Sequence, residues 1–151
     1  MGLFSFLTRE IAIDLGTANT IIIHNDKVVV DEASIVAIER STGKIIAFGK
    51  KALMMHGKTH ENIKTVRPLR DGVIADFQSA EYMIREMIKM IGSPNTLFPP
   101  ALKMVICIPS GITEVEERAV KDSAEQAGAK EVRQIHEPMA AAIGIGIDVL
   151  E

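Results

Sequence analysis

The chain has 151 residues, enough for one domain with a substantial core, and its hydrophobic (47%) and charged (25%) shares are ordinary for a globular protein. A formal net charge of -3 gives no electrostatic reason to expect a nucleic-acid partner, and we predict none. The single cysteine, Cys107, excludes an internal disulfide, and its apolar neighbours predict that it packs as a small hydrophobe in a reducing cytosol.

The first seven residues are unusually apolar, and four of them are bulky: Leu3, Phe4, Phe6 and Leu7. The segment lacks the basic region and cleavage site of a signal peptide, and Phe6 stands where the myristoylation pattern requires Ser or Thr. Two interpretations stay open. The segment is either an unstructured or core-packed terminus, or it lies in a membrane interface.

The next part of the chain predicts an antiparallel meander. Short apolar and β-branched runs indicate three strands, over residues 11–15, 20–24 and 27–30. Asn25-Asp26 marks the tight turn between the second and third strands. A further hairpin is predicted from the runs at 35–38 and 44–48, which flank Ser41-Thr-Gly43.

The remaining chain alternates helices and strands. Helices are predicted over residues 50–58, 79–91 and 113–127, and from residue 137 onwards, with strands over 104–108 and 132–135. Residues 59–72 are polar and basic. A stripe of Met and Ile at helical spacing in 79–91 indicates core packing, and Thr113 with Glu116 forms a capping box. The order predicts an α/β fold whose mixed sheet is flanked by helices.

The segment from Asp14 to Thr20 is a tight turn between two strands. Gly16 permits backbone angles that a side chain would forbid, and small residues after it let the main chain approach a ligand. Successive N–H groups in such a turn can form an anion-binding nest, to which the hydroxyls of Thr17 and Thr20 add donors. Asp14 beside phosphates implies Mg²⁺ held largely through water. The candidate nucleotide-binding residues are therefore Asp14, Gly16, Thr17, Ala18, Asn19 and Thr20. The alternative is a plain hairpin that ends in an aspartate.

Glu137 is the second candidate for chemistry. It is predicted at the N-cap of the last helix, with Pro138 at the first helical position. A carboxylate is favoured there by the helix dipole alone, so one interpretation is simple capping. The other is that Glu137 points into a cleft and orients a water for attack on a phosphate.

Three segments, 13–20, 108–113 and 135–142, occur in order, with 67–76 between them. With these segments the chain resembles the MreB family of bacterial actins over essentially its whole length. The wider superfamily includes actin, sugar kinases and the seventy-kilodalton heat-shock chaperones. The N-terminal half of a chaperone-type ATPase is the alternative, although those chaperones usually carry Pro-Ala-Tyr where this chain has Pro-Ser-Gly-Ile-Thr.

The resemblance implies an actin-like (ribonuclease H-like) fold that uses ATP and Mg²⁺. It implies that Asp14 lies near the metal, that Thr17, Ala18 and Asn19 contact the nucleotide, and that Glu137 positions the hydrolytic water. Residues 1–31 and 75–151 resemble a base subdomain, and 32–74 a small α+β insert. The family's second phosphate loop would follow Glu151, so we expect an ATPase as the parent protein and weak or no nucleotide binding by this chain alone.

The resemblance also implies a cytoplasmic, ATP-dependent filament on the inner face of the cell membrane that directs cell-wall synthesis and rod shape. Partners would be further copies of the chain and cell-wall elongation proteins such as RodZ and MreC. Membrane contacts are implied at the N-terminal apolar residues and at Leu97-Phe98 in a proline-bounded loop. Val115 lies roughly 110° from the predicted buried cluster of its helix, which consists of Ala119, Val120, Ser123 and Ala127. It resembles the position where two antiparallel protofilaments meet. The alternative is a tolerated surface valine.

Overall fold

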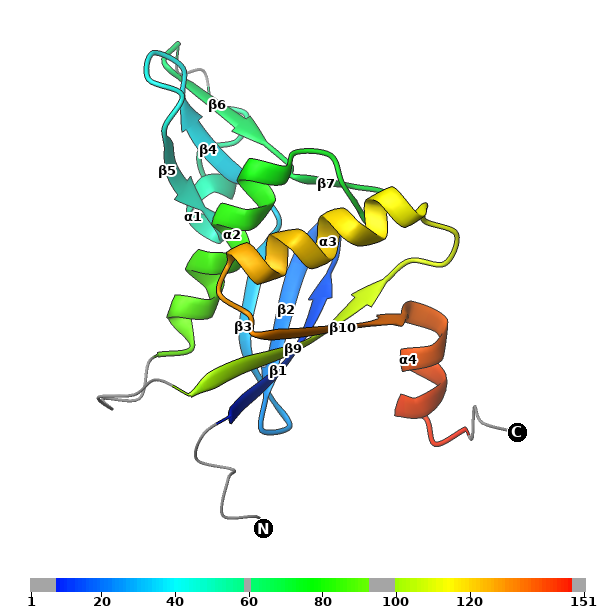
Figure 1. The fold of residues 1–151 in the computed structure, drawn as a ribbon. Helices are drawn as coiled ribbons and strands as arrows, with labels where there is room; N and C mark the ends of the chain where they lie inside the picture. Colours follow the sequence, from blue (N-terminus) through cyan, green and yellow to red (C-terminus); the bar gives the residue numbers. More distant parts are fainter. Residues whose placement is uncertain (1–7, 59–60, 93–99, 148–151) are drawn as a thin grey trace.

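The structure is a computed structural model that describes residues 8–58, 61–92 and 100–147 (Figure 1). The candidate membrane residues all lie outside these ranges: Leu3, Phe4, Phe6, Leu7, Leu97 and Phe98. In the ranges that are described, no helix has the length and apolar character needed to cross a membrane.

Strands and helices follow the alternating order predicted from the sequence. The strands are β1 (Thr8–Leu15), β2 (Asn19–His24), β3 (Lys27–Ala33), β4 (Val36–Glu39), β5 (Ile45–Phe48), β6 (Ile63–Val66), β7 (Leu69–Arg70), β8 (Val73–Ile74), β9 (Ala101–Ile108) and β10 (Glu131–His136). The helices are α1 (Gly49–Leu53), α2 (Phe77–Met90), α3 (Glu114–Gln126) and α4 (Glu137–Gly144).

The main sheet has five strands in the order β10-β9-β1-β2-β3. β1, β2 and β3 form the predicted antiparallel meander, while β9 runs parallel to both β1 and β10. Asn25 and Asp26 both have positive φ, 51° and 58°, as a two-residue hairpin turn of this kind requires. The mixed sheet flanked by helices is thereby confirmed.

One face of this sheet is covered by α2 and α3 (Figure 1). Alternate residues of β1, such as Ile11 and Ile13, point into the resulting core, as the period of two in a strand dictates. The Met and Ile stripe of α2 packs against them with Met83, Ile84 and Met87 fully buried, as predicted.

A second sheet, β5-β4-β6, carries the predicted hairpin and has its own small core. That core consists of Ala33, Ile35, Ala37, Ala47 and Ala52. The region predicted only as polar chain, residues 59–72, contains β6 and β7, and β7 pairs with β8 across the turn Asp71-Gly72. Helix α1 is shorter than the predicted 50–58, and α2 begins earlier than predicted because Asp76 accepts a hydrogen bond from the Ser79 N–H as its cap.

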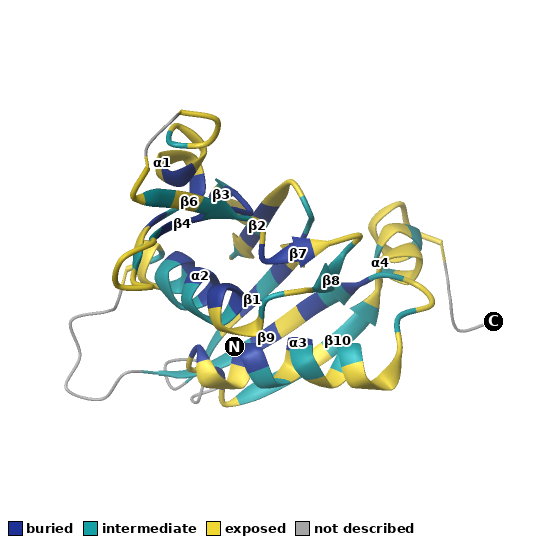
Figure 2. Cartoon of the chain, turned by 90° about the horizontal axis from the view of Figure 1, so that it is seen from above, coloured by how far each residue is buried: buried dark blue, intermediate teal, exposed yellow. Residues whose placement is uncertain are grey.

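Among the described residues, α2 and α3 leave the other face of the main sheet uncovered (Figure 1). Ile23 and Val105 project from it and keep 40% and 39% of their surface exposed. Helix α4 lies beyond the end of β10, away from α2 and α3, and none of its residues is buried (Figures 1 and 2). We call the face of the main sheet opposite α2 and α3 the open face.

Candidate functional site

The predicted site residues meet where the parallel strands β1, β9 and β10 end. Asp14 of β1 lies opposite Cys107 of β9, and Cys107 lies opposite Ile135 of β10. Because their neighbours Ile13 and Ile106 are buried on the helix-covered side, Asp14 and Cys107 point to the open face. The carboxyl ends of parallel strands are a common place for ligand sites in α/β proteins.

Cys107 connects the two candidate carboxylates. Burial raises the pKa of its thiol, and the negative charges of Asp14 and then Glu137 raise this pKa further. Asp14 and Glu137 are 123 positions apart in the sequence. The fold brings both within electrostatic reach of one thiol. The prediction that Cys107 packs as a small hydrophobe is wrong, since the side chain is only half-buried and faces these charges.

Glu137 is placed one position later in its helix than predicted. His136 is the N-cap of α4, without a side-chain capping bond, so Glu137 is the first helical residue and Pro138 follows it. The carboxylate is exposed at the positive end of the helix dipole. The helix dipole alone still favours a carboxylate at this position, so both interpretations of Glu137 stay open.

The carbonyl groups of the turn between β1 and β2 accept hydrogen bonds from other parts of the chain. The Ser34 hydroxyl lies 2.6 Å from Gly16 O, and the Ser34 N–H lies 2.8 Å from Ala18 O. Arg67 Nη1 makes a longer contact, 3.4 Å, to Thr17 O. Within the described residues, the N–H groups of Thr17 and Ala18 donate no hydrogen bond. The turn thus presents unpaired donors on the side away from its carbonyls, the arrangement of an anion-binding nest.

Two of the predicted reasons for this turn need correction. Gly16 does not have positive φ; a side chain is excluded there because a Cβ would lie 2.5 Å from Asn19 O. The Thr20 side chain is fully buried, and its oxygen lies 2.9 Å from the Ser34 hydroxyl oxygen. The Thr20 hydroxyl therefore stabilises the turn from inside the fold and does not face the side on which the free N–H groups lie.

The β7–β8 hairpin contacts the same turn. Gly72 donates its N–H to Thr17 Oγ1 at 2.9 Å, and a Cβ on Gly72 would lie 2.4 Å from Pro109 Cγ. Sequence analysis missed Ser34, Arg67 and Gly72 as contributors to the site. Only Asp71-Gly72 carries a local signal, that of a two-residue hairpin turn; the other contacts come from distant parts of the chain.

The donor set fits a hydrated magnesium ion and does not form a complete metal cage. In the described part of the chain, no three His, Cys, Asp or Glu side chains cluster as metal ligands. Mg²⁺ usually keeps several waters and takes one or two carboxylates together with substrate phosphates. Asp14, exposed beside the free N–H groups of the turn, matches that mode.

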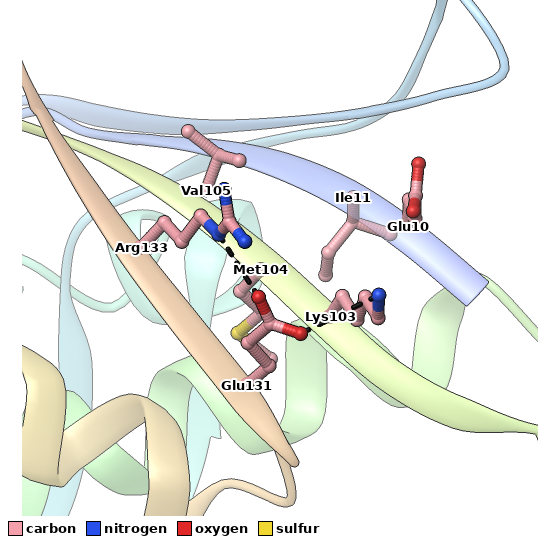
Figure 3. A pocket seen from close by; sticks show the side chains of 7 residues that line it. All are labelled: Glu10, Ile11, Lys103, Met104, Val105, Glu131 and Arg133. Carbon is pink, nitrogen blue, oxygen red and sulfur yellow. Dashed lines mark hydrogen bonds and ion pairs between the residues drawn. The ribbon is translucent and has the colours of Figure 1, made fainter. Parts of the chain in front are cut away.

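A hollow of about 270 Å³ on the open face lies apart from this site (Figure 3). Glu131 forms ion pairs with two cations that line this hollow. Lys103 Nζ lies 3.4 Å and Arg133 Nε 2.9 Å from its carboxylate oxygens. These cations hold the pKa of Glu131 below its usual range, through hydrogen bonds from Arg133 and then Lys103. The strand register places Glu131 and Lys103 far from Asp14, at the other end of β9, so the hollow contains none of the predicted site residues.

Comparison with known proteins assigns the family. Residues 8–151 match the family model described as MreB/Mbl protein. The chain belongs to the MreB/Mbl family. The match decides between the two alternatives left open by the sequence in favour of the bacterial actins.

Similar proteins within and beyond the MreB/Mbl family agree. The cell shape-determining protein MreB of Escherichia coli (strain K12) is 45% identical over 99% of this chain and 44% of its own length. The cell shape-determining protein Mbl of Bacillus subtilis (strain 168) is 42% identical over 95% and 43%. The chain therefore spans less than half the length of these relatives.

Among solved structures, MreB5 of Spiroplasma citri bound to ADP has a TM-score of 0.78 and 37% identity, covering 93% of this chain and 42% of that one. The same protein bound to AMPPNP has a TM-score of 0.77. A MamK double helical filament, at 20% identity and a TM-score of 0.76, shows the shared fold alone.

Proposed function

We propose that this chain supplies the first phosphate-binding half of an ATP site in a cytoskeletal, actin-like protein that determines cell shape. The observation that carries the proposal is the turn from Gly16 to Ala18. Its carbonyls accept hydrogen bonds from Ser34, and the N–H groups of Thr17 and Ala18, which donate none among the described residues, follow Asp14 closely in the chain. The ADP- and AMPPNP-bound relatives and the shape-determining MreB and Mbl proteins support it.

Each residue then has a distinct role. The N–H groups of Thr17 and Ala18 bind phosphate oxygens, and Asp14 holds Mg²⁺ through water. Bound Mg²⁺ supplies positive charge that neutralises the phosphates. Glu137, exposed at the start of α4, accepts a hydrogen bond from a water and orients it toward the terminal phosphate.

The cellular setting is part of the same proposal. We place the protein on the inner face of the cell membrane, as an ATP-dependent filament that guides cell-wall synthesis with partners such as RodZ and MreC. We also propose residues 1–31 and 75–151 as a base subdomain and 32–74 as an insert. These finer points rest on the resemblance to the MreB/Mbl family.

Titration of the isotope-labelled chain with MgATP tests the nucleotide site, since nuclear magnetic resonance detects weak binding. We expect the amide signals of Thr17 and Ala18 to shift with MgATP. Asp14→Asn should remove the dependence of this shift on Mg²⁺, and Glu137→Ala should leave binding unchanged. Where ATP turnover is measured, Glu137→Ala should slow phosphate release by roughly 10²-fold. Glu125→Ala, on the exposed side of α3, is the control. Shifts confined to residues outside the turn would contradict the proposal.

A further inference from the structure

Ser34 lies behind the phosphate turn, where β3 ends and the small sheet begins. The residue is fully buried. Its side-chain oxygen lies 2.6 Å from Gly16 O and 2.9 Å from Thr20 Oγ1, and its N–H lies 2.8 Å from Ala18 O. One residue therefore contacts the turn at both of its ends and contacts the strand that follows it.

The hydrogen positions in this group follow from the chemistry. The Gly16 carbonyl can only accept, so the Ser34 hydroxyl must donate to it. Ser34 has one hydroxyl proton, and the Thr20 hydroxyl must therefore donate to Ser34. The result is a directed chain, from Thr20 through Ser34 to Gly16, and such chains strengthen each of their bonds in a low-dielectric interior.

The peptide geometry links this chain to the ligand side of the turn. Described peptide bonds are all trans, so the C=O of one residue and the N–H of the next point in opposite directions. The hydrogen bond from Ser34 to Gly16 O therefore directs the Thr17 N–H away from Ser34. The bond from Ser34 to Ala18 O does the same for the Asn19 N–H. We propose that Ser34 is a positioning residue for the phosphate turn: through the Gly16 carbonyl it fixes the Thr17 N–H, one of the two proposed phosphate donors, toward the anion without touching it.

This inference rests on the proposed function, because it assigns Ser34 a role in the same nucleotide site. A second buried serine shows that burial does not by itself produce such contacts. Ser123 in α3 is equally buried, and its hydroxyl has no hydrogen-bond partner among the described residues. Ser123→Ala therefore removes the same buried hydroxyl at a place remote from the turn, and it is the matched control.

The test compares wild type, Ser34→Ala and Ser123→Ala, each isotope-labelled and titrated with MgATP. We expect Ser34→Ala to weaken binding about fivefold, as for the loss of one ordinary hydrogen bond, with smaller shifts at the Thr17 amide. Ser123→Ala should bind like wild type. Equal affinity of wild type and Ser34→Ala would overturn the inference. If Ser34→Ala does not fold, Ser34→Cys keeps the packing with a much weaker donor, and the same expectation applies to it.

A measurement without ligand separates the inference from the proposed function. Residual dipolar couplings report the direction of the Thr17 and Asn19 N–H bonds in the free chain. They should change in Ser34→Ala and stay unchanged in Ser123→Ala; unchanged couplings in both would overturn the inference. If MgATP shifts nothing in wild type, the proposed nucleotide site fails for this chain, while the couplings still decide whether Ser34 orients the turn.

Discussion

At the scale of single residues, Cys107 is a reporter of the charges in the site. Its half-buried thiol lies near Asp14 and Glu137, and its pKa is raised by burial and then by these two carboxylates. A raised pKa means that less reactive thiolate is present at any pH near neutrality. We therefore expect alkylation of Cys107 by iodoacetamide to be slow, with a pH profile displaced above that of a free thiol.

The two carboxylates can be separated in the same assay. Asp14→Asn removes the larger of the two charge effects, so the alkylation profile should move to lower pH. Glu137→Gln should move it in the same direction by less. Glu125→Gln, on the exposed side of α3, is the control and should leave the profile in place. A profile insensitive to Asp14→Asn would mean that this carboxylate does not face the thiol.

Residue types predicted the chemistry of the site better than its detailed geometry. Asp14 and Glu137 were selected from the sequence, and the fold places both around Cys107. The reason for Gly16 was predicted wrongly, because a close approach to Asn19 O cannot be distinguished from a positive φ in sequence. Ser34 was missed because its partners come from another strand and no local pattern marks a residue that donates to a distant carbonyl.

At the scale of elements, the β7–β8 hairpin depends on a glycine at its tip. Gly72 has φ 78°, and a Cβ there would meet Pro109 Cγ at 2.4 Å. Gly72→Ala combines backbone strain with this collision, so we expect a loss of roughly 2–3 kcal/mol in the free energy of unfolding, measured by urea denaturation. The Thr17 hydroxyl should also lose its bond from the Gly72 N–H as the hairpin moves.

Gly43→Ala is the matched control for that substitution. Gly43 has a similar φ of 70°, but no atom lies within 4 Å of the place where its Cβ would be. It should therefore cost only the strain, about 1 kcal/mol. Equal losses for the two variants would show that the contact between Gly72 and Pro109 contributes nothing.

Helix α3 presents the second test at this scale. Val115 is 79% exposed, whereas Val120, Ser123 and Ala127 on the other side of α3 are buried as predicted. Ala119, predicted with them, is only half-buried, and Ala124 takes its place in the core. Exposure of Val115 is compatible with both a protofilament contact and a tolerated surface valine.

A charge at Val115 distinguishes these two interpretations. In protein that forms filaments, we expect Val115→Glu to leave single protofilaments but prevent their pairing, as seen by electron microscopy. Val28→Glu makes the same change at a valine on β3 that is 61% exposed, and it should leave pairing unaffected. Paired filaments of the Val115 variant would support the surface valine.

Most strands and helices of this chain could be predicted because their apolar periodicity is strong. The β7–β8 hairpin and β6 were not, since two-residue strands carry no period and β6 is stabilised by pairing with β4. The capping box of α3 was confirmed, and hydrogen bonds from the backbone and side chain of Thr113 hold the pKa of Glu116 below its usual range. Local interactions of this kind can be recognised in sequence, whereas pairings between distant segments cannot.

At the scale of the whole molecule, the two apolar segments implied to contact the membrane attach to the fold side by side. Thr8 begins β1 and pairs with Ala101 at the beginning of β9. Arg9 links this edge to the end of α2 through a 3.1 Å bond to Ile91 O. The described strand beginnings that follow 1–7 and 93–99 in the chain, Thr8 and Ala101, are therefore neighbours at one edge.

Sedimentation with liposomes tests whether these segments act together. We expect this chain to bind weakly, since burying one Leu or Phe is worth at most about 1.5–3 kcal/mol and interfacial insertion is partial. Filaments should bind more tightly, because each subunit adds its own contacts. Replacing Leu3, Phe4, Leu97 and Phe98 by Ser should abolish binding while circular dichroism stays unchanged.

A control variant removes exposed apolar side chains elsewhere. Leu53 and Met54, at the end of α1, are 42% and 63% exposed, and replacing both by Ser should leave liposome binding as it was. Undiminished binding by the fourfold variant would place the anchor in another part of the protein. Loss of its circular dichroism signal would instead place the four residues in the core.

The pairing of β1 with β9 also bears on how this chain folds. β1 ends at Leu15 and β9 begins at Ala101, and closing so long a loop costs entropy before any contact between the strands forms. The small sheet lies within that loop and has a separate core around Ile35 and Ala52. When it forms first, it makes the intervening chain compact and brings the two strands closer. We therefore expect the small core, when it forms first, to speed the assembly of the main sheet, to which most of its residues do not belong.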